Sequence, residues 1–282
     1  MANKTVTTRS GSAKRAKRNA VVFPAHARLF SSHVVAAPIS NIVRKGADSL
    51  TAQEQQIFKS AVTKAIADGT YSRLVSIHAD MSHDMHTMQG MPAGSLRFLP
   101  WHRLYLVNFE QALRVFEPTF FVPHWRWMDQ STLPPWMVSF KPTGVIDENG
   151  NPITITRSPG TNPNAPSLPS TNTIQTTAMN QSDYRSFTLA LEGARPFGAH
   201  NLVHVWFNGT MSVVPIAPAD PMFWMHHAEI DRIWTVWAST HPGQVPTLSG
   251  ADAVLDPWPE QVSDVLSTQI GAYSYSYDLT TL

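Results

Sequence analysis

Histidines are the residues of this sequence whose number and spacing indicate chemistry. Two groups of four stand out among the twelve histidines: His78, His83, His86 and His102, and then His200, His204, His226 and His227. Neutral imidazole is a ligand for copper, zinc, iron and nickel. The sequence contains no cysteine, so disulfides, thiolate ligands and thiol catalysis are excluded. Any metal must therefore be held by nitrogen and oxygen.

The second group begins with "HNLVH", in which His200 and His204 are spaced to leave the same face of a helix. Taken alone, this pair is as often an ordinary surface or core pair as a metal site. It is not the zinc-protease motif, because Asn201 stands where that motif requires a glutamate. His227, in "DPMFWMHHAEIDRIW", adds a third imidazole from another predicted helix. We predict one three-histidine site with open coordination positions.

The first group repeats this arrangement. His102 lies in "RFLPWHRLYLVNFE", while His78 with either His83 or His86 comes from the preceding helix and loop. Paired carboxylate-histidine motifs of the di-iron bundle proteins are absent. All-imidazole ligation without cysteine favours copper over iron.

Helices are predicted to position both groups. Thr51 and Glu54 have the spacing of a capping box, and Gly69 is predicted to end that helix. The stretch "YSRLVSIHADMSHDMH" predicts a second helix. A third is expected to have Pro100 in its first turn and to end at Pro118.

The second half continues with helices after an irregular segment. Residues 141–180 are predicted to form a long surface excursion with a hairpin turn at Asn149 and Gly150. Helical patterns follow in "YRSFTLALEG" and "FGAHNLVHVWFNG". The last helix is expected to begin with Asp220 as its N-cap and Pro221 at its first position. The tail "YSYSYDLTTL" alternates as an edge strand does.

Composition excludes several classes of partner. The chain has 282 residues, 43% hydrophobic and 15% charged, and a net charge of +1, which indicates neither a nucleic-acid nor a membrane-surface partner. No run approaches the roughly 18 apolar residues of a membrane span. Residues 1–40 are predicted to form a basic flexible arm without a clear signal peptide, compatible with a cytoplasmic protein or with export alongside a partner.

Three motifs together resemble the type-3 dicopper proteins, which are the tyrosinases, catechol oxidases and haemocyanins: "RFLPWHRLYLVNFE", "HNLVHVW" and "DPMFWMHHAEIDRIW". The resemblance runs from about Arg44 to Tyr277 and is greatest to bacterial tyrosinases. The closing "YSY" resembles a tyrosine motif that packs near an early arginine, here Arg44. The resemblance implies a mainly α fold, with a four-helix-bundle core holding a dicopper site, long loops and minor β-hairpin elements. Residues 41–282 are expected to form one catalytic domain.

Ligands follow from the resemblance residue by residue. The first copper ion is expected on His78, His86 and His102, and the second on His200, His204 and His227. His83 competes with His86, because the family usually places its second and third ligands nine residues apart and position 93 is alanine here. His226 is left a packing or hydrogen-bonding role. Asp231 is expected either to accept a hydrogen bond at the site or to pair with Arg232 or another cation on the helix surface.

Another departure is "VPHWRW", where the family commonly has "PYWDW". His124 and Arg126 replace the usual residues, so a local pairing is either lost or rebuilt. The covalent bond between a cysteine and a copper-binding histidine in some eukaryotic members cannot form here.

Monophenols add a requirement for a base, since a phenol has a pKa near 10 and binds copper well only as phenolate. The family's tyrosinases are thought to use a water held by a glutamate and an asparagine, and Glu192 and Asn201 occupy those places. The alternatives are an exposed helix-end carboxylate and an ordinary polar turn residue. Ile216 resembles a position that lines the substrate entrance.

The predicted function is therefore a tyrosinase that uses two copper ions, with dioxygen as co-substrate, to oxidise small phenols to o-quinones. A catechol or o-aminophenol oxidase is the alternative. An oxygen carrier is less favoured, because carriers of this family have a further domain over the site and this sequence stops at Leu282. A copper-delivery partner and a homo-oligomer are both compatible with the sequence.

Overall fold

The computed structural model describes residues 39–88, 93–129, 132–193 and 198–282. The chain divides into two units between Val34 and Val35, and the fold below is that of the second unit. The predicted arm of residues 1–40 lies outside the described residues except for its last two. No helix in the described part is long and apolar enough to cross a membrane.

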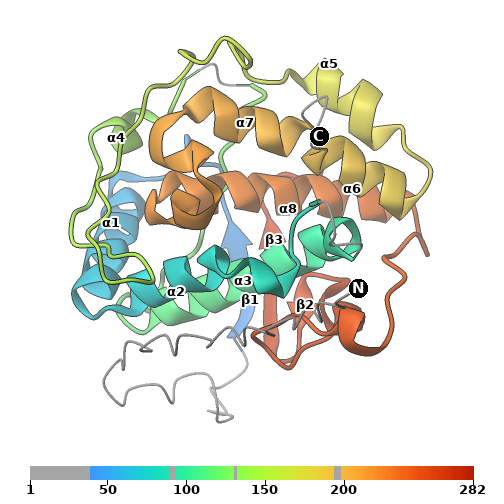
Figure 1. Cartoon of the computed structure of the whole chain (residues 1–282), viewed down its shortest axis with the longest axis horizontal. Coiled ribbons are helices and arrows are strands. Elements are labelled where there is room, and N and C mark those ends of the chain that lie inside the picture. Colours follow the sequence, from blue (N-terminus) through green and yellow to red (C-terminus); the bar gives the residue numbers. More distant parts are fainter. Residues whose placement is uncertain (1–38, 89–92, 130–131, 194–197) are drawn as a thin grey trace, which may run out of the picture. The chain divides into compact units, whose positions relative to one another are not determined.

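Four helices carry the histidine groups. They are α2 (Thr70–Ala79), α3 (Gly94–Arg114), α7 (Ala199–Phe207) and α8 (Met222–Thr240). In Figure 1, α8 runs between α7 on one side and α2 and α3 on the other. Helix α3 packs on α8 and on α6 (Tyr184–Glu192), and α6 packs on α7. The predicted mainly α fold with a helical core is confirmed.

Helix α1 (Ala52–Ala67) packs against α2 and α3 and begins as predicted. The Thr51 hydroxyl accepts from the Glu54 backbone N–H, and the Glu54 carboxylate accepts from the Thr51 backbone N–H, which completes the capping box. Gly69, with φ of +82°, separates α1 from α2. A left-handed glycine is the usual way to end a helix.

Pro100 does not start α3, and that prediction is wrong. The helix begins at Gly94, so Pro100 lies inside it, and it ends at Arg114 before Pro118 is reached. A proline within a helix removes the hydrogen bond to the carbonyl four residues earlier. Here that carbonyl, on Leu96, accepts from the Tyr184 hydroxyl of α6 at 3.1 Å. A tertiary contact therefore replaces the missing helical bond.

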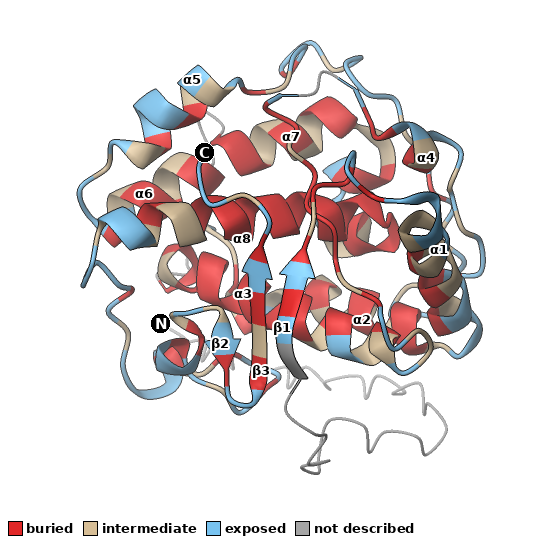
Figure 2. Ribbon diagram, turned by 180° about the vertical axis from the view of Figure 1, so that it is seen from behind, coloured by how far each residue is buried: buried red, intermediate tan, exposed pale blue. Residues whose placement is uncertain are grey.

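The closing tyrosines lie in the middle strand of a small sheet, and not at its edge as predicted. The strand order is β1-β3-β2: β1 (Ile39–Arg44) is parallel to β3 (Tyr273–Tyr277), and β2 (Gln269–Ile270) is antiparallel to it. The partner of β3 comes from the other end of the chain, so local sequence does not reveal it. The three tyrosines of β3 are buried and Ser276 between two of them is exposed, so the strand has both red and pale blue parts in Figure 2.

The excursion over residues 141–180 contains a turn where the hairpin was predicted. A single bridge joins Ile146 to Pro152, and the Asp147 carboxylate accepts from the backbone N–H groups of Asn149 and Asn151. Short helical elements surround the long helices: η1 (Met81–His83), α4 (Pro135–Val138), α5 (Thr171–Ile174), η2 (Gln175–Met179), η3 (Gly209–Ser212), η4 (Val214–Ala219), η5 (Gly250–Ala253) and η6 (Val262–Val265).

Asp220 holds the excursion to the start of α8. Its carboxylate accepts from the Met222 backbone N–H at 3.0 Å, as expected of a cap. The helix begins at Met222 with Pro221 as its N-cap, one residue later than predicted. Arg157, from the excursion, donates to both Asp220 oxygens at 2.7 Å. This buried pair ties the long loop to a ligand-bearing helix.

Candidate metal centre

The histidines meet in two clusters. One consists of His78, His86 and His102; the other consists of His200, His204, His226 and His227. In each cluster one ring nitrogen per residue lies within 4.8 Å of the others. His83 lies outside the first cluster, and its ring stacks 6.2 Å from that of Trp101. The structure thus brings His86, and not His83, beside His78 and His102.

Within each cluster the Nε2 atoms face one another. His78 Nε2 lies 3.2 Å from His86 Nε2 and 3.5 Å from His102 Nε2. In the second cluster, His200 Nε2 lies 3.2 Å from His227 Nε2 and 3.0 Å from His204 Nε2.

The hydrogen bonds of the Nδ1 atoms show which ring nitrogens carry a proton. His102 Nδ1 donates to the Phe98 carbonyl at 2.8 Å, and His204 Nδ1 donates to the Met211 carbonyl at 2.7 Å. A carbonyl only accepts, so each of these neutral rings carries its proton on Nδ1 and its lone pair on Nε2. The side-chain oxygens of Glu192 and Asn201 fix the same tautomer in two further rings.

In the contact between His200 and His204 both tautomers are fixed, so two lone pairs face each other at 3.0 Å and need a cation between them. Nitrogens bound to one metal at about 2.0–2.1 Å lie roughly 3.3–3.6 Å apart in a three- or four-coordinate site. One observed separation, 3.5 Å, lies in this range, and the other three, at 3.0–3.2 Å, lie slightly below it. The residues present therefore fit two metal ions of the kind that imidazole binds, and no carboxylate or thiolate belongs to either cluster.

Burial keeps these rings neutral. It lowers the pKa of His78, His102, His200 and His227 well below 6.5, and neighbouring imidazoles lower it further. The pKa of His204 falls to about 4, chiefly through burial. A histidine must be deprotonated to bind a metal. At neutral pH these side chains are ready to do so.

The two clusters form one centre. The rings of His102 and His227 stack with centroids 4.3 Å apart, so one histidine of each cluster contacts the other directly. The ring centroid of Phe98 lies 4.8 Å from those of both His102 and His200. The ring centroid of Phe223 lies 4.1 Å from that of His227 and 5.0 Å from that of His78. These phenylalanines give the centre apolar walls, which exclude water and strengthen electrostatic interactions inside.

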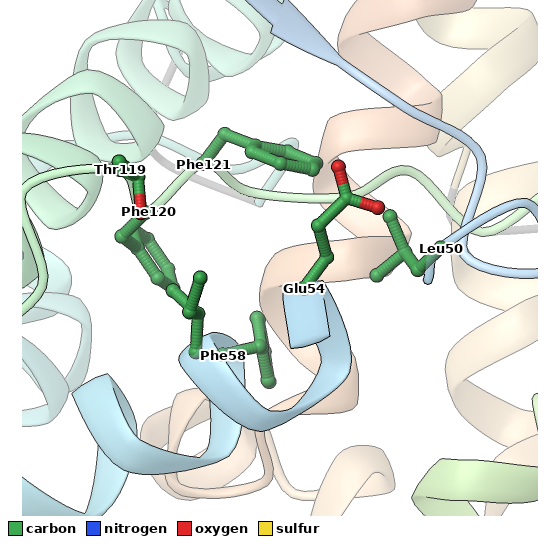
Figure 3. A pocket seen from close by; sticks show the side chains of 7 residues that line it. Leu50, Glu54, Phe58, Thr119, Phe120 and Phe121 are labelled. Atoms are coloured by element: carbon green, nitrogen blue, oxygen red, sulfur yellow. The ribbon is translucent and has the colours of Figure 1, made fainter. Parts of the chain in front are cut away.

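One edge of the centre is partly open. The His86 side chain is 12% exposed, and His204 and Asn201 are half-buried, whereas His78, His102, His200 and His227 are buried. Ile216, predicted at the entrance, is half-buried on η4, which packs against α2 and α8. The small pocket in Figure 3 lies elsewhere, between α1 and residues 119–121, and no histidine lines it.

Glu192 is not the exposed helix-end carboxylate of the alternative interpretation. It is 3% exposed, and its Oε1 accepts from His86 Nδ1 at 3.0 Å and from the Thr87 backbone N–H at 2.9 Å. Its Oε2 accepts from the Thr87 hydroxyl. The sequence did not identify Thr87 as part of the site, because a threonine in a loop is common.

Asn201 lies beside Glu192 because two segments approach closely. Its Oδ1 accepts from His200 Nδ1 at 2.8 Å, and its Nδ2 donates to the carbonyl of Gly193, the residue after Glu192, at 3.0 Å. A Cβ at Gly198 would lie 2.3 Å from the Leu191 carbonyl oxygen, so only glycine allows α7 to begin there. Gly94 is its counterpart at α3, where a Cβ would lie 1.9 Å from the His86 carbonyl oxygen.

Asp231 accepts no hydrogen bond from a histidine of either cluster; it pairs with cations other than Arg232, and it does so inside the protein and not on the helix surface. It accepts from Arg103 Nε at 2.6 Å and from the Tyr275 hydroxyl at 2.7 Å, while Arg232 pairs with Glu229 at 2.7 Å. One turn after His227, the side chain of Asp231 points toward α3 and the sheet. Burial alone would raise the pKa of Asp231, but the charges of Arg103 and Arg44 hold it below its usual value.

The arginine near the closing tyrosines is Arg44, in agreement with the motif. It pairs with Glu110 at 2.8 Å, and its guanidinium lies 3.7 Å from the ring centre of Tyr275. Tyr273 donates to Glu110 at 2.6 Å, and Arg44 lies 3.4 Å from Asp231. One buried network thus joins β1, β3, α3 and α8.

The pairing around "VPHWRW" is rebuilt. His124 is buried, and its Nδ1 bonds Glu229 at 2.8 Å while its Nε2 bonds Asp278 at 2.7 Å. Arg126 pairs with Asp129 at 2.5 Å. His226 is also buried, and its ring stacks 5.2 Å from that of His200. Neither nitrogen of His226 has a hydrogen-bond partner among the described residues.

Comparisons with known proteins agree with this geometry. The model of the common central domain of tyrosinase matches residues 68–166 and 142–240. A tyrosinase from Streptomyces galbus is 33% identical over 273 residues, covering 83% of this chain and 99% of that protein. Unit D of a Helix pomatia haemocyanin chain is 28% identical over 225 residues, covering 72% of this chain and 52% of its own.

A solved structure shows the same fold. Deoxygenated haemocyanin from Rapana thomasiana superposes with a TM-score of 0.63 at 24% identity, covering 86% of this chain and 70% of its own. Proteins of the matched family use two copper ions, and the two histidine clusters fit them. Sequence and fold agree that this chain belongs to the tyrosinase family of dicopper oxidases.

Proposed function

We propose that this protein is a tyrosinase that oxidises monophenols and o-diphenols to o-quinones. His78, His86 and His102 would hold one copper ion, and His200, His204 and His227 the other. When bound, the copper pair supplies the redox chemistry with dioxygen, and the protein supplies orientation and proton handling. Overall, one monophenol and one dioxygen give one o-quinone and one water.

The placement of Asn201 next to Glu192 carries the proposal. The Asn201 amide contacts the carbonyl that follows Glu192, at the edge where His86 and His204 are partly exposed. An ionised carboxylate has about four lone-pair sites, and His86 and Thr87 use three of those on Glu192. One site is left, and in this proposal it would hold a water that also bonds to Asn201. We propose that this water takes the proton of the incoming phenol.

Substrate access would follow the same edge. A phenol that enters between His86 and His204 would place its oxygen beside both clusters. Its ring would then extend outward past Ile216. The apolar walls formed by Phe98 and Phe223 keep bulk water out of the centre. Proximity of this kind accounts for much of the rate of many enzymes.

Oxygen uptake by copper-loaded protein tests the proposal, first with a monophenol and then with the matching catechol. Uptake with both substrates supports a tyrosinase. In Asn201→Ala and Glu192→Gln, the monophenol rate should fall by about 10²–10⁴ at full copper occupancy, with a smaller effect on the catechol. Uptake with catechol alone would make the protein a catechol or o-aminophenol oxidase. Reversible oxygen binding without turnover would make it an oxygen carrier.

A further inference from the structure

His86 differs from the other five proposed copper ligands. Those five lie on helices α2, α3, α7 and α8, whereas His86 lies in the loop after η1. A helix fixes the backbone of a ligand, but a loop does not. Some other contact must therefore hold His86 in place.

Three hydrogen bonds donated to one carboxylate supply that contact. Glu192 accepts from the His86 ring, from the Thr87 backbone N–H and from the Thr87 hydroxyl. The two donors of Thr87 engage both oxygens and so orient the carboxylate. Oε1 also accepts from His86 Nδ1, while His86 Nε2 faces His78 at 3.2 Å. The Glu192 side chain is only 4% exposed, so water competes little for these bonds.

We infer that Thr87 and Glu192 form a clamp that holds His86 with its proton on Nδ1 and its Nε2 directed at the first copper ion. Thr87 is thus a positioning residue, acting through Glu192. The inference rests on the proposed ligand role of His86 and is independent of whether monophenols are hydroxylated. Partners of metal-binding histidines typically change metal affinity about 10–100-fold when they are mutated.

The first consequence concerns the metal-free protein. In Thr87→Val the side chain keeps its shape but loses the hydroxyl, whereas Thr87→Ser keeps the hydroxyl. Histidine ring ¹H–¹⁵N correlation spectra report the tautomer of each ring. Wild type and Thr87→Ser should show His86 protonated on Nδ1, and Thr87→Val should show a mixture of tautomers. An unchanged His86 tautomer in Thr87→Val would overturn the clamp.

Copper(I) titration in competition with a chelator tests the second consequence. Ring signals of His78 and His102 report the first copper ion, and those of His200 and His227 report the second. Thr87→Val should lower the affinity for the first copper ion by about tenfold and leave the affinity for the second unchanged. Thr87→Ser should bind both ions with wild-type affinity. Equal affinity in all proteins, or equal loss at both clusters, would contradict the inference.

Thr188→Val is the matched control. Thr188 lies on α6, one turn before Glu192, and its buried hydroxyl donates to the Ser95 carbonyl at 3.0 Å. This variant loses a comparable hydrogen bond without touching a histidine of either cluster, so both copper affinities should stay as in wild type. A tenfold loss in Thr188→Val would reduce the effect of Thr87 to general destabilisation. If wild-type protein binds two copper ions but does not oxidise monophenols, the proposed function is refuted while the inference about the clamp is unaffected.

Discussion

Arg103 Nε donates a hydrogen bond to Asp231 Oδ1 over 2.6 Å, and both side chains are buried, with exposures of 1% and 3%. Arg103 directly follows His102 on α3, and Asp231 comes one turn after His227 on α8. The ion pair thus joins the two helices next to the histidines whose rings stack across the centre. It fixes the separation of the two clusters from outside.

Replacing Asp231 with asparagine should destabilise the protein strongly. The variant leaves Arg103 and Arg44 buried with less opposing charge, and breaking a buried pair in this way typically costs about 3–5 kcal/mol of unfolding free energy. Urea denaturation of the metal-free protein measures the change. Lys64→Gln is the control, because Lys64 is 51% exposed and its pair with Glu117 should contribute about 0–1 kcal/mol. A loss below 1 kcal/mol in Asp231→Asn would argue against the network's role.

Stability of the metal-free protein should fall as the pH is lowered from about 6.5 toward 4. The pKa of His204 is about 4 in the folded protein, and the other buried cluster histidines are also lowered by burial. Between these values the unfolded chain binds more protons than the folded one, so stability rises with pH and is lost as the pH falls. Melting temperatures measured from pH 7.5 to 4.5 test this. A flat profile between pH 6.5 and 5 would contradict it.

Removing copper should lower the melting temperature. The metal binds the folded clusters, which the unfolded chain lacks, so a free concentration of 100 times the dissociation constant adds about 2.7 kcal/mol. Differential scanning calorimetry of loaded and chelator-treated protein gives the difference. Readdition of copper should restore the higher value, and equal melting temperatures would show that the clusters are not the binding sites.

Two glycines should affect the two clusters separately. Gly94→Ala puts a Cβ against the His86 carbonyl, and Gly198→Ala puts one against the Leu191 carbonyl beside the start of α7. Overpacking of this kind typically costs about 1–3 kcal/mol. Gly94→Ala should weaken copper binding mainly at the first cluster and Gly198→Ala mainly at the second, as followed by the ring signals. The reverse pattern would refute these contacts.

Much of the helical framework could be predicted from local sequence. The capping box of α1 and the helical spacing of His200 and His204 are local signals, and the structure has both elements. The predicted start of α3 at Pro100 was wrong because the effect of this proline depends on Tyr184, which is distant in sequence. Tyr184 supplies the hydrogen bond that the Leu96 carbonyl would otherwise lack.

Other parts of the site depend on contacts that no local pattern carries. The middle position of β3 depends on β1 from the opposite end of the chain. The choice of His86 over His83 as the neighbour of His78 depends on Glu192 and Gly94, which hold the loop. The pairing of Arg103 with Asp231 leaves no local pattern either, because an arginine can pair with any carboxylate that the fold brings near.

The most direct test of the account is the number of copper ions bound per chain. Copper should be quantified after reconstitution in wild type, His86→Gln, His204→Gln and His83→Gln. Two ions are expected in wild type and in His83→Gln, because His83 lies outside the first cluster. One tightly bound ion is expected in each of the other two variants. A single ion in wild type, or loss of an ion in His83→Gln with both retained in His86→Gln, would contradict the proposed dicopper centre.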